Sequence, residues 1–250
     1  MSEMILLKLG GSVITRKSSA GMIDSDRLRF LANEIGAREG ARLAVVHGAG
    51  SFGHPEARKY GIVNGVDASN LEGIFVTHSA VRRLNREVVS ALRGGGCEAI
   101  GIHPLSSAIA KDGRLISMEY RPLSVMIGLG VVPILHGDVV MDLIKGATIV
   151  SGDQLVNYLA RNLRFHRIGL ATDVPGILDR DRVIPFITPD TVGSIDIGDS
   201  KAPDVTGGMK GKVREMIELA RQGIRSEIFH VDRIGDFLDG KPHGGTVITG

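Results

Sequence analysis

The stretch His47-Gly-Ala-Gly-Ser-Phe-Gly-His54 combines three glycines with a histidine at each end. It follows Leu43–Val46, a short β-branched apolar run that predicts a buried strand. Glycines lack a Cβ atom, so their backbone N–H groups can approach an anion closely. One interpretation is a phosphate site with a titratable donor, and the other is a plain glycine-rich turn between a strand and a helix.

A lysine lies near the end of the first apolar run of the chain. Lys8 belongs to Met4–Leu9, which predicts a strand, and Gly10, Gly11 and Ser12 follow directly. Burying an ammonium group alone is costly, so Lys8 either extends to solvent at the strand end or points at an anion beside the turn. The N–H groups of the glycines and the serine could bind the same anion.

Three later segments carry polar residues at the ends of expected elements: Ser151-Gly152-Asp153-Gln154, Ala171–Ile177 and Asp204–Lys212. The first opens a helix with an N-cap serine and an acid in the first turn, and its glycine can also offer an N–H group to a ligand. The second follows a buried strand, where ligands bind in doubly wound sheets. The third carries three glycines and two lysines into a helix, which suits a nucleotide phosphate tail. A capped turn is the alternative for each.

These segments together favour phosphoryl transfer. Glycine-rich turns at 10–11, 48–53 and 207–211 each adjoin Lys or His. The transition state of phosphoryl transfer spreads negative charge over phosphate oxygens, which lysines and N–H groups stabilise. Lys17, in a polar loop, is either a further such charge or a solvated surface residue. We see no Cys/His metal cluster and no Ser-His-Asp triad, so we expect Mg²⁺ to arrive with the nucleotide, held by phosphate oxygens and water.

Positioning these segments requires a scaffold that gathers strand ends. Apolar runs alternate with segments of helical period at Asp24–Ile35, Asn70–Leu92 and Met209–Gln222. The alternation predicts βαβ units and a mostly parallel, doubly wound α/β sheet. We expect Asp24 to cap its helix and Thr246–Thr249 to close the sheet as an edge strand.

Two regions depart from this alternation. Val139–Asp142 and Ala147–Val150 predict a hairpin, and 178–203 predicts short, irregular strands and turns. No repeat or linker divides the chain, so we expect a single domain, 1–250, whose second half begins near Ser151.

Composition limits the class of protein. The chain has 250 residues, 43% of them hydrophobic, and a formal net charge of +2, which gives no argument for nucleic acid or a membrane surface. The single cysteine, Cys97, adjoins an apolar segment and fits a core thiol in a reducing compartment. We see no signal peptide and no apolar stretch near ~18 residues, so we expect a cytoplasmic protein.

Four of these segments resemble signatures of the amino acid kinase superfamily: Lys8–Ser12, Ser151–Asp153, Thr172–Gly176 and Thr206–Lys212. Within it, His47–His54 together with Gly10–Lys17 is most similar to the isopentenyl phosphate kinase family. Related kinases of acetylglutamate, aspartate and uridylate have a glycine-rich turn there but lack the terminal Ser-Phe-Gly-His. The resemblance spans essentially the whole chain and implies a three-layer αβα sandwich with a mostly parallel open sheet.

The resemblance implies transfer of the ATP γ-phosphoryl group to isopentenyl phosphate, giving isopentenyl diphosphate, an isoprenoid precursor, and ADP. It implies an acceptor lobe formed mainly by 1–150 and a nucleotide lobe formed mainly by 151–250. It also suggests a homodimer. The residues that it implies for catalysis are Lys8, Lys17, His54 and Asp153, with Lys17 the main stabiliser of the transition state and Asp153 orienting Lys8.

The resemblance implies further binding roles. Acceptor contacts fall to Ala49, Gly50, His54 and Gly152. Nucleotide contacts fall to Lys8, Gly10, Gly11, Ser12, Gly50, Asp173, Gly176, Gly208 and Lys212. The prenyl chain needs an apolar slot, and we expect the helix after Asn70 to provide it through Ile74, Phe75 and His78, with ordinary core packing as the alternative for Ile74.

One residue departs from the family pattern, and one histidine of the glycine-rich stretch is expected to have a structural role. Pro175 stands where relatives often have a polar residue, which bears on Asp173 and Gly176. His47 is expected to pack or bond structurally rather than bind substrate. The competing functions are another small-acid or phosphonate kinase of this fold, such as a fosfomycin-type kinase or glutamate 5-kinase, and a non-catalytic nucleotide-binding protein.

Overall fold

A computed structural model describes residues 3–16, 21–38, 40–195 and 208–250. The α-helices are α1 (Gly11–Ile14), α2 (Ser25–Gly36), α3 (Gly50–Lys59), α4 (Glu72–Gly94), α5 (Arg121–Gly128), α6 (Gly152–Asn162), α7 (Gly208–Ala220) and α8 (Ile234–Leu238). Short 3-10 helices are η1 (Ile62–Asn64), η2 (Pro104–Ser106), η3 (Val192–Ser194) and η4 (Val231–Arg233).

The strands are β1 (Met4–Leu9), β2 (Arg42–His47), β3 (Ala99–Gly101), β4 (Ala108–Lys111), β5 (Arg114–Met118), β6 (Val132–His136), β7 (Asp138–Asp142), β8 (Gly146–Val150), β9 (Arg167–Thr172), β10 (Leu178–Asp179), β11 (Arg182–Val183), β12 (Phe186–Ile187), β13 (Ser226–His230) and β14 (Thr246–Ile248).

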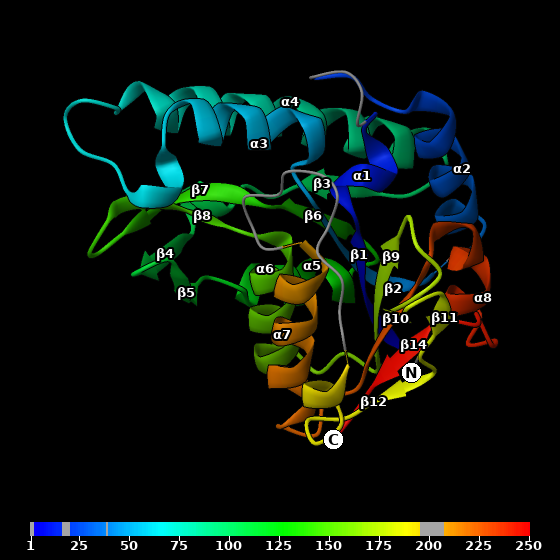
Figure 1. The fold of residues 1–250 in the computed structure, drawn as a ribbon. Helices are drawn as coiled ribbons and strands as arrows, with labels where there is room; N and C mark the ends of the chain where they lie inside the picture. Colours follow the sequence, from blue (N-terminus) through cyan, green and yellow to red (C-terminus); the bar gives the residue numbers. More distant parts are fainter. Residues whose placement is uncertain (1–2, 17–20, 39, 196–207) are drawn as a thin grey trace.

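The main sheet has eight strands in the order β12-β14-β13-β9-β1-β2-β6-β3. All neighbours pair in parallel except β13 and β14. Helices cover both faces, with α3 and α4 above and α5, α6 and α7 below in Figure 1. The mostly parallel, doubly wound α/β sheet predicted from the sequence is therefore confirmed.

The alternation of side chains along β1 separates two cores. Met4 and Leu6 pack in the cluster that includes α6 and α7, whereas Ile5, Leu7 and Leu9 pack with α2, α4 and α8. Successive side chains of a strand point to opposite faces, so an apolar strand such as β1 is buried on both. By the same period, Lys8 lies on the α6 face of the sheet.

A smaller sheet, in the order β5-β4-β7-β8, extends beside α3 and α4. Its β7–β8 hairpin confirms the predicted pairing. The hairpin β4–β5 was not predicted, because its strands carry exposed residues with little apolar alternation. Between this sheet and α3 lies a small apolar cluster of Ala57, Ile62, Val139 and Ala147.

Two local predictions are tested directly. Asp24 caps α2, since its carboxylate accepts the Arg27 N–H at 3.0 Å. The prediction that Thr246–Thr249 forms an edge strand is wrong: β14 lies between β13 and β12. The true edge, β12, is two residues long and comes from the irregular region, where so short a strand gives no periodic signal.

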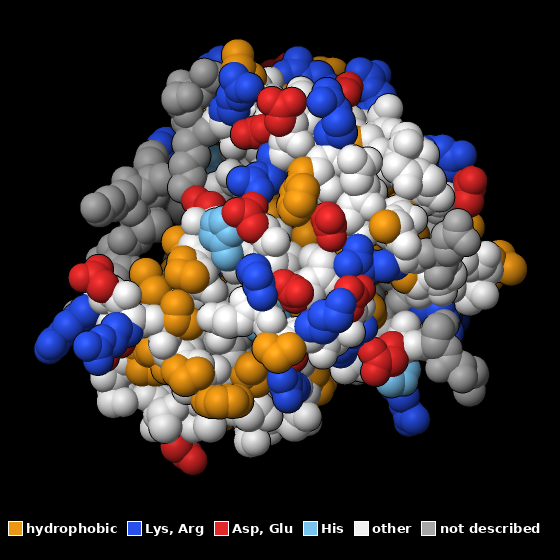
Figure 2. All heavy atoms as spheres, turned by 90° about the vertical axis from the view of Figure 1, so that its right-hand side faces the viewer, with side chains coloured by type: hydrophobic (Ala, Val, Ile, Leu, Met, Phe, Trp, Pro, Cys, Tyr) orange, Lys and Arg blue, Asp and Glu red, His pale blue; other side chains and the backbone are white. Residues whose placement is uncertain are grey.

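The surface beside α2 and α8 carries charges of both signs, interspersed (Figure 2). Arg38 Nε and Asp239 Oδ1 lie 2.8 Å apart, and Arg27 pairs with Asp232. This mixture agrees with the small net charge of +2. Among the described residues, no helix is both long and apolar enough to span a membrane.

Candidate active site

The glycine-rich turns follow strands that are neighbours in the sheet, so they meet at its carboxyl edge. The Gly10 N–H, after β1, donates to the Ala171 carbonyl of β9 at 2.9 Å. The Gly48 N–H, after β2, donates to the Leu9 carbonyl of β1 at 3.0 Å. Parallel pairing therefore continues one residue past the strands and aligns the two turns.

The turns touch each other through backbone atoms. A Cβ on Gly11 would lie 2.4 Å from Gly50 N, and a Cβ on Gly48 would lie 2.6 Å from Gly11 N. Ala49 has right-handed helical angles (φ −72°, ψ −24°), and Gly50 follows with a φ of 51°. A right-handed residue followed by a left-handed one forms a concave array of N–H groups that suits an anion. The interpretation of this stretch as a phosphate site is therefore compatible with its backbone.

The start of α3 is held by one side chain and one backbone group outside the helix. The Ser51 N–H donates to Thr15 Oγ1 at 3.1 Å, and the Ser51 carbonyl accepts the Gly21 N–H at 3.0 Å. That carbonyl is available because Pro55, four residues on, has no N–H. Gly53 has a different role from the other glycines: a Cβ there would lie 2.5 Å from Val81 Cγ1 of α4, so its lack of a side chain serves helix packing.

Lys8, Asp153 and Lys212 form a buried charged group. Lys8 Nζ lies 2.6 Å from Asp153 Oδ1, and Lys212 Nζ lies 3.4 Å from the same oxygen. The three side chains come from β1, the first turn of α6 and α7, and each residue is at most 9% exposed. One carboxylate between two ammonium groups leaves a net positive charge, which favours a phosphate ligand.

The ionisation of this group follows from burial and from mutual attraction. Burial lowers the pKa of Lys8 to about 8, Asp153 opposes that effect, and the Lys212 charge adds to it. Burial alone would raise the pKa of Asp153, but Lys212 and Lys8 outweigh it and hold the pKa below its ordinary value. Asp153 is thus a carboxylate that keeps two lysines in place.

The start of α6 matches both interpretations of its sequence. Ser151 is the N-cap, since its Oγ accepts the Gln154 N–H at 3.1 Å. Gly152 lies beside the charged group: a Cβ there would be 3.0 Å from Lys8 Cε and 3.3 Å from the carbonyl oxygen of His47. Ser151 therefore caps the helix, and Gly152 at the same time lies next to Lys8 of the charged group.

The other residues predicted to bind the acceptor differ in their exposure and in their contacts. His54 is half-buried in α3, five residues beyond the Ala49 turn. His78 is 17% exposed at its side chain and bonds Asp138 at 3.0 Å, whereas Phe75 is 67% exposed. Ile74 packs on the small apolar cluster beside α3, in line with the core alternative. Lys17 lies outside the described residues.

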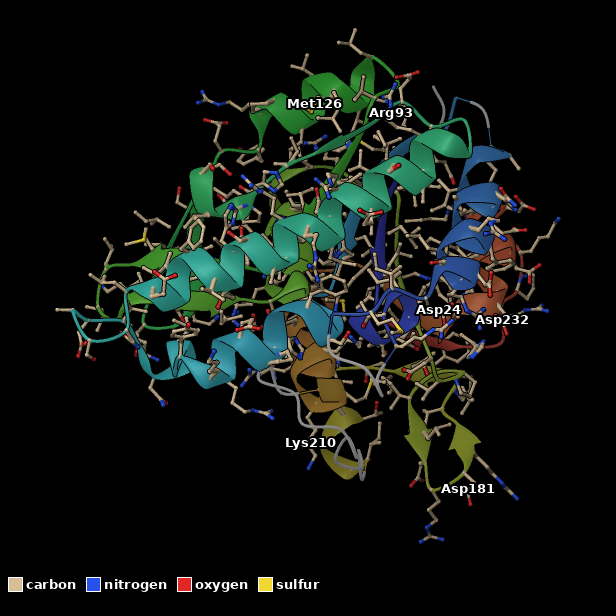
Figure 3. The ribbon with its side chains drawn as sticks, turned by 90° about the horizontal axis from the view of Figure 1, so that it is seen from above. Asp24, Arg93, Met126, Asp181, Lys210 and Asp232 are labelled. Atoms are coloured by element: carbon tan, nitrogen blue, oxygen red, sulfur yellow. The ribbon has the colours of Figure 1, made fainter. Side chains whose placement is uncertain are left out.

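The predicted nucleotide residues not yet described lie after β1, after β9 and at the start of α7. Asp173 is exposed, and Gly176 is buried where a Cβ would lie 2.8 Å from Thr246 Oγ1. Ser12 lies in α1 directly after Gly11, and Gly208 begins α7 with a φ of 55°. Figure 3, seen from above, shows Lys210 near the start of α7.

Sequence reasoning missed a row of histidines under α4. His47 and His136 are in register on β2 and β6, and their rings stack 5.6 Å apart. His103 Nδ1 lies 2.9 Å from His136 Nε2. Both strand-end histidines precede a glycine and place Nδ1 3.0 Å from the carbonyl oxygen of that glycine. The repeated His-Gly dipeptide after an apolar run was the available signal.

Comparisons with known proteins agree with this geometry. A sequence model of the amino acid kinase family matches residues 3–230. The chain is 39% identical to isopentenyl phosphate kinase of Methanothermobacter thermautotrophicus and 40% identical to that of Haloferax volcanii, each over 99% of both chains. An X-ray structure of isopentenyl phosphate kinase superposes with a TM-score of 0.86 at 35% identity, covering 98% of this chain and 100% of the other.

The matches extend over both halves of the sheet and therefore include β1, the glycine-rich turns and α6. The chain belongs to the amino acid kinase family, in the group of the isopentenyl phosphate kinases.

Proposed function

We propose that this enzyme, a phosphotransferase, transfers the γ-phosphoryl group of ATP to isopentenyl phosphate, giving isopentenyl diphosphate and ADP and thereby an isoprenoid precursor. The observation that supports it most is the buried Lys8–Asp153–Lys212 group beside two interlocked glycine turns. Relatives named isopentenyl phosphate kinase match the chain over its full length.

In the proposed reaction, a phosphate oxygen of the acceptor forms a bond to the γ-phosphorus. The bond from the γ-phosphorus to the β–γ bridging oxygen breaks, and its electron pair leaves with ADP. A phosphate monoester is already an oxyanion near neutral pH, so the reaction needs positioning and charge stabilisation rather than a strong base.

The site residues take the following proposed roles. Protonated Lys8, oriented by Asp153, stabilises charge on the transferring group, and Lys17 is the main stabiliser of the transition state. The N–H groups of Ala49 and Gly50 bind the acceptor phosphate, which His54 contacts as a donor. Further proposed contacts are Gly152, Phe75 and His78 on the acceptor side and Gly10, Gly11, Ser12, Asp173, Gly176, Gly208 and Lys212 on the nucleotide side.

A kinase uses ATP, usually with a divalent cation, and we propose Mg²⁺. Oδ1 of Asp153 already accepts from two ammonium groups, so this oxygen is occupied by lysine. In the described part of the chain, no group of three or more His, Cys, Asp or Glu side chains is arranged to hold a metal ion. The proposed Mg²⁺ would be bound by nucleotide phosphate oxygens and water, and would neutralise phosphate charge.

We further propose an acceptor lobe formed mainly by 1–150, a nucleotide lobe formed mainly by 151–250, a homodimer and a cytoplasmic location. Light scattering of the purified protein measures its mass and tests the dimer. A particle with the mass of one chain would contradict it.

One comparison tests the function: ADP release measured with isopentenyl phosphate, glutamate, uridylate and fosfomycin as acceptors under the same conditions. We expect turnover with isopentenyl phosphate well above that with the other three. Clear turnover with another acceptor and none with isopentenyl phosphate would overturn the proposal.

A further inference from the structure

His47 is buried at the end of β2 and is bonded at both ring nitrogens. Its ring is 0% exposed, as part of the core between β2, β6 and α4. Asn85 of α4, 1% exposed, places Nδ2 3.1 Å from His47 Nε2 and 3.1 Å from the Ile134 carbonyl. On the other side, His47 Nδ1 lies 3.0 Å from the Gly48 carbonyl oxygen.

These partners determine which ring nitrogen carries the proton. The Ile134 carbonyl can only accept, so the Asn85 atom facing it is the amide nitrogen, which can only donate. The same nitrogen faces His47 Nε2, which therefore accepts and is unprotonated. The proton of the neutral ring is on Nδ1, which donates to the Gly48 carbonyl. Burial lowers the pKa of His47 to about 4, so the ring is neutral at neutral pH.

The hydrogen bond from His47 orients the peptide between Gly48 and Ala49, in the glycine-rich turn after β2. The Gly48 carbonyl and the Ala49 N–H belong to one trans peptide, in which they point in opposite directions. With the carbonyl held toward the buried ring, the Ala49 N–H points away from that ring. Neither this N–H nor that of Gly50 makes a hydrogen bond to another described residue. Both donors are therefore available to an anion.

The Gly48–Ala49 peptide is oriented by backbone contacts between the turns and by the hydrogen bond from His47. Gly48 has no side chain to anchor its peptide, and a Cβ there is excluded by Gly11 N at 2.6 Å. A peptide next to glycine rotates more freely than others, so the hydrogen bond from His47 adds to the bond from the Gly48 N–H to Leu9 in holding the Gly48–Ala49 peptide.

We propose that His47, held in one tautomer by Asn85, is a positioning residue that aims the Ala49 N–H at the acceptor phosphate. This inference rests on the proposed function for the identity of the acceptor. His47 itself does not touch the substrate; it acts through the Gly48–Ala49 peptide.

The test compares two substitutions of His47. In His47→Asn the side-chain amide nitrogen takes the place of Nδ1 and can still donate to the Gly48 carbonyl, whereas His47→Leu cannot. For His47→Leu we expect the KM for isopentenyl phosphate to rise about 10- to 100-fold, because one charge-assisted hydrogen bond to the acceptor phosphate is lost. The KM for ATP should stay within about twofold of wild type. His47→Asn should restore most of the acceptor affinity.

Leu31→Ala, a core substitution in α2, is the control for lost stability. It should lower the melting temperature without a selective rise in the acceptor KM. An acceptor KM in His47→Leu no higher than in this control would overturn the proposal, as would a His47→Asn variant with the same acceptor defect as His47→Leu.

A measurement on the wild-type protein covers the case in which His47→Leu does not fold. The ring ¹H–¹⁵N spectrum should show His47 as the Nδ1–H tautomer, and the Nε2–H tautomer would contradict the inference. If the wild-type enzyme turns over a different acceptor, the function proposal fails, while the same variants assayed with that acceptor still test the role of His47.

Discussion

Gly11 and Gly50 come from two different turns, and a Cβ on Gly11 would lie 2.4 Å from the backbone nitrogen of Gly50. Only backbone atoms are involved, so no side chain can move aside to relieve the contact. The two turns that carry the proposed phosphate donors thus form one packed unit at the end of β1 and β2.

Gly11→Ala should separate these turns. We expect a loss of about 1–3 kcal/mol of stability from overpacking and a fall of at least about 100-fold in kcat/KM, because the N–H groups of both turns shift. Thermal unfolding and steady-state kinetics measure the two effects. Gly94→Ala, at the end of α4 with nothing within 4 Å of the added Cβ, is the matched control and should behave like wild type. Equal behaviour of both variants would contradict the tight contact.

Asp153→Asn should destabilise the protein more than Lys8→Met does. Asp153 lies against two buried ammonium groups, so its loss removes the carboxylate that Lys8 and Lys212 share, at a cost of about 3–5 kcal/mol. After Lys8→Met, Asp153 still has Lys212 as a partner. Denaturant unfolding of the three proteins measures the difference. A smaller loss in Asp153→Asn than in Lys8→Met would argue against the carboxylate as the centre of the group.

Activity should fall at alkaline pH as Lys8 loses its proton. Burial lowers its pKa to about 8, so kcat/KM, which reports the free enzyme, should decline as pH rises through about 8. The Lys212 charge also lowers the Lys8 pKa. Lys212→Met should therefore lose activity overall but move the midpoint of the decline to higher pH. If the pH midpoint of the activity loss in Lys212→Met stays in place or moves to lower pH, the loss is not caused by deprotonation of Lys8.

Stability should respond to the same proton. The pKa of Lys8 is about 8 when folded, below the value of 10.5 without the protein environment, so between these pH values the unfolded chain binds more protons. Stability from this group therefore rises with pH across that interval and is independent of pH below it. The stability difference between wild type and Lys8→Met, followed by denaturant unfolding, should shift in favour of wild type from about pH 8 to 10.

His54→Ala should weaken acceptor binding selectively. His54 lies in α3, which follows β2, while several of the proposed nucleotide residues follow β9 or begin α7. We expect the KM for isopentenyl phosphate to rise about 10-fold or more and the ATP KM to stay within about twofold. Steady-state kinetics with each substrate varied in turn provide both constants. A similar rise in both would count against an acceptor role.

Local patterns of residues suffice to predict the alternation of strands and helices, the mostly parallel sheet and the glycine turns at strand ends, because these depend on local period and on missing side chains. They also mark Asp24 and Ser151 as helix caps. These features are set within a few residues of the chain, so pattern and residue type suffice to predict them.

Only the tertiary structure brought Lys8, Asp153 and Lys212 to one oxygen atom, because their separations of 145 and 59 residues are closed by strand order and helix packing. It also gave Gly53 a packing role and placed β14 inside the sheet. The tautomer of His47 depends on Asn85, 38 residues away on α4, and no local pattern records such a contact. A side chain's charge and proton position are set by whatever packs against it, and that is decided by the fold.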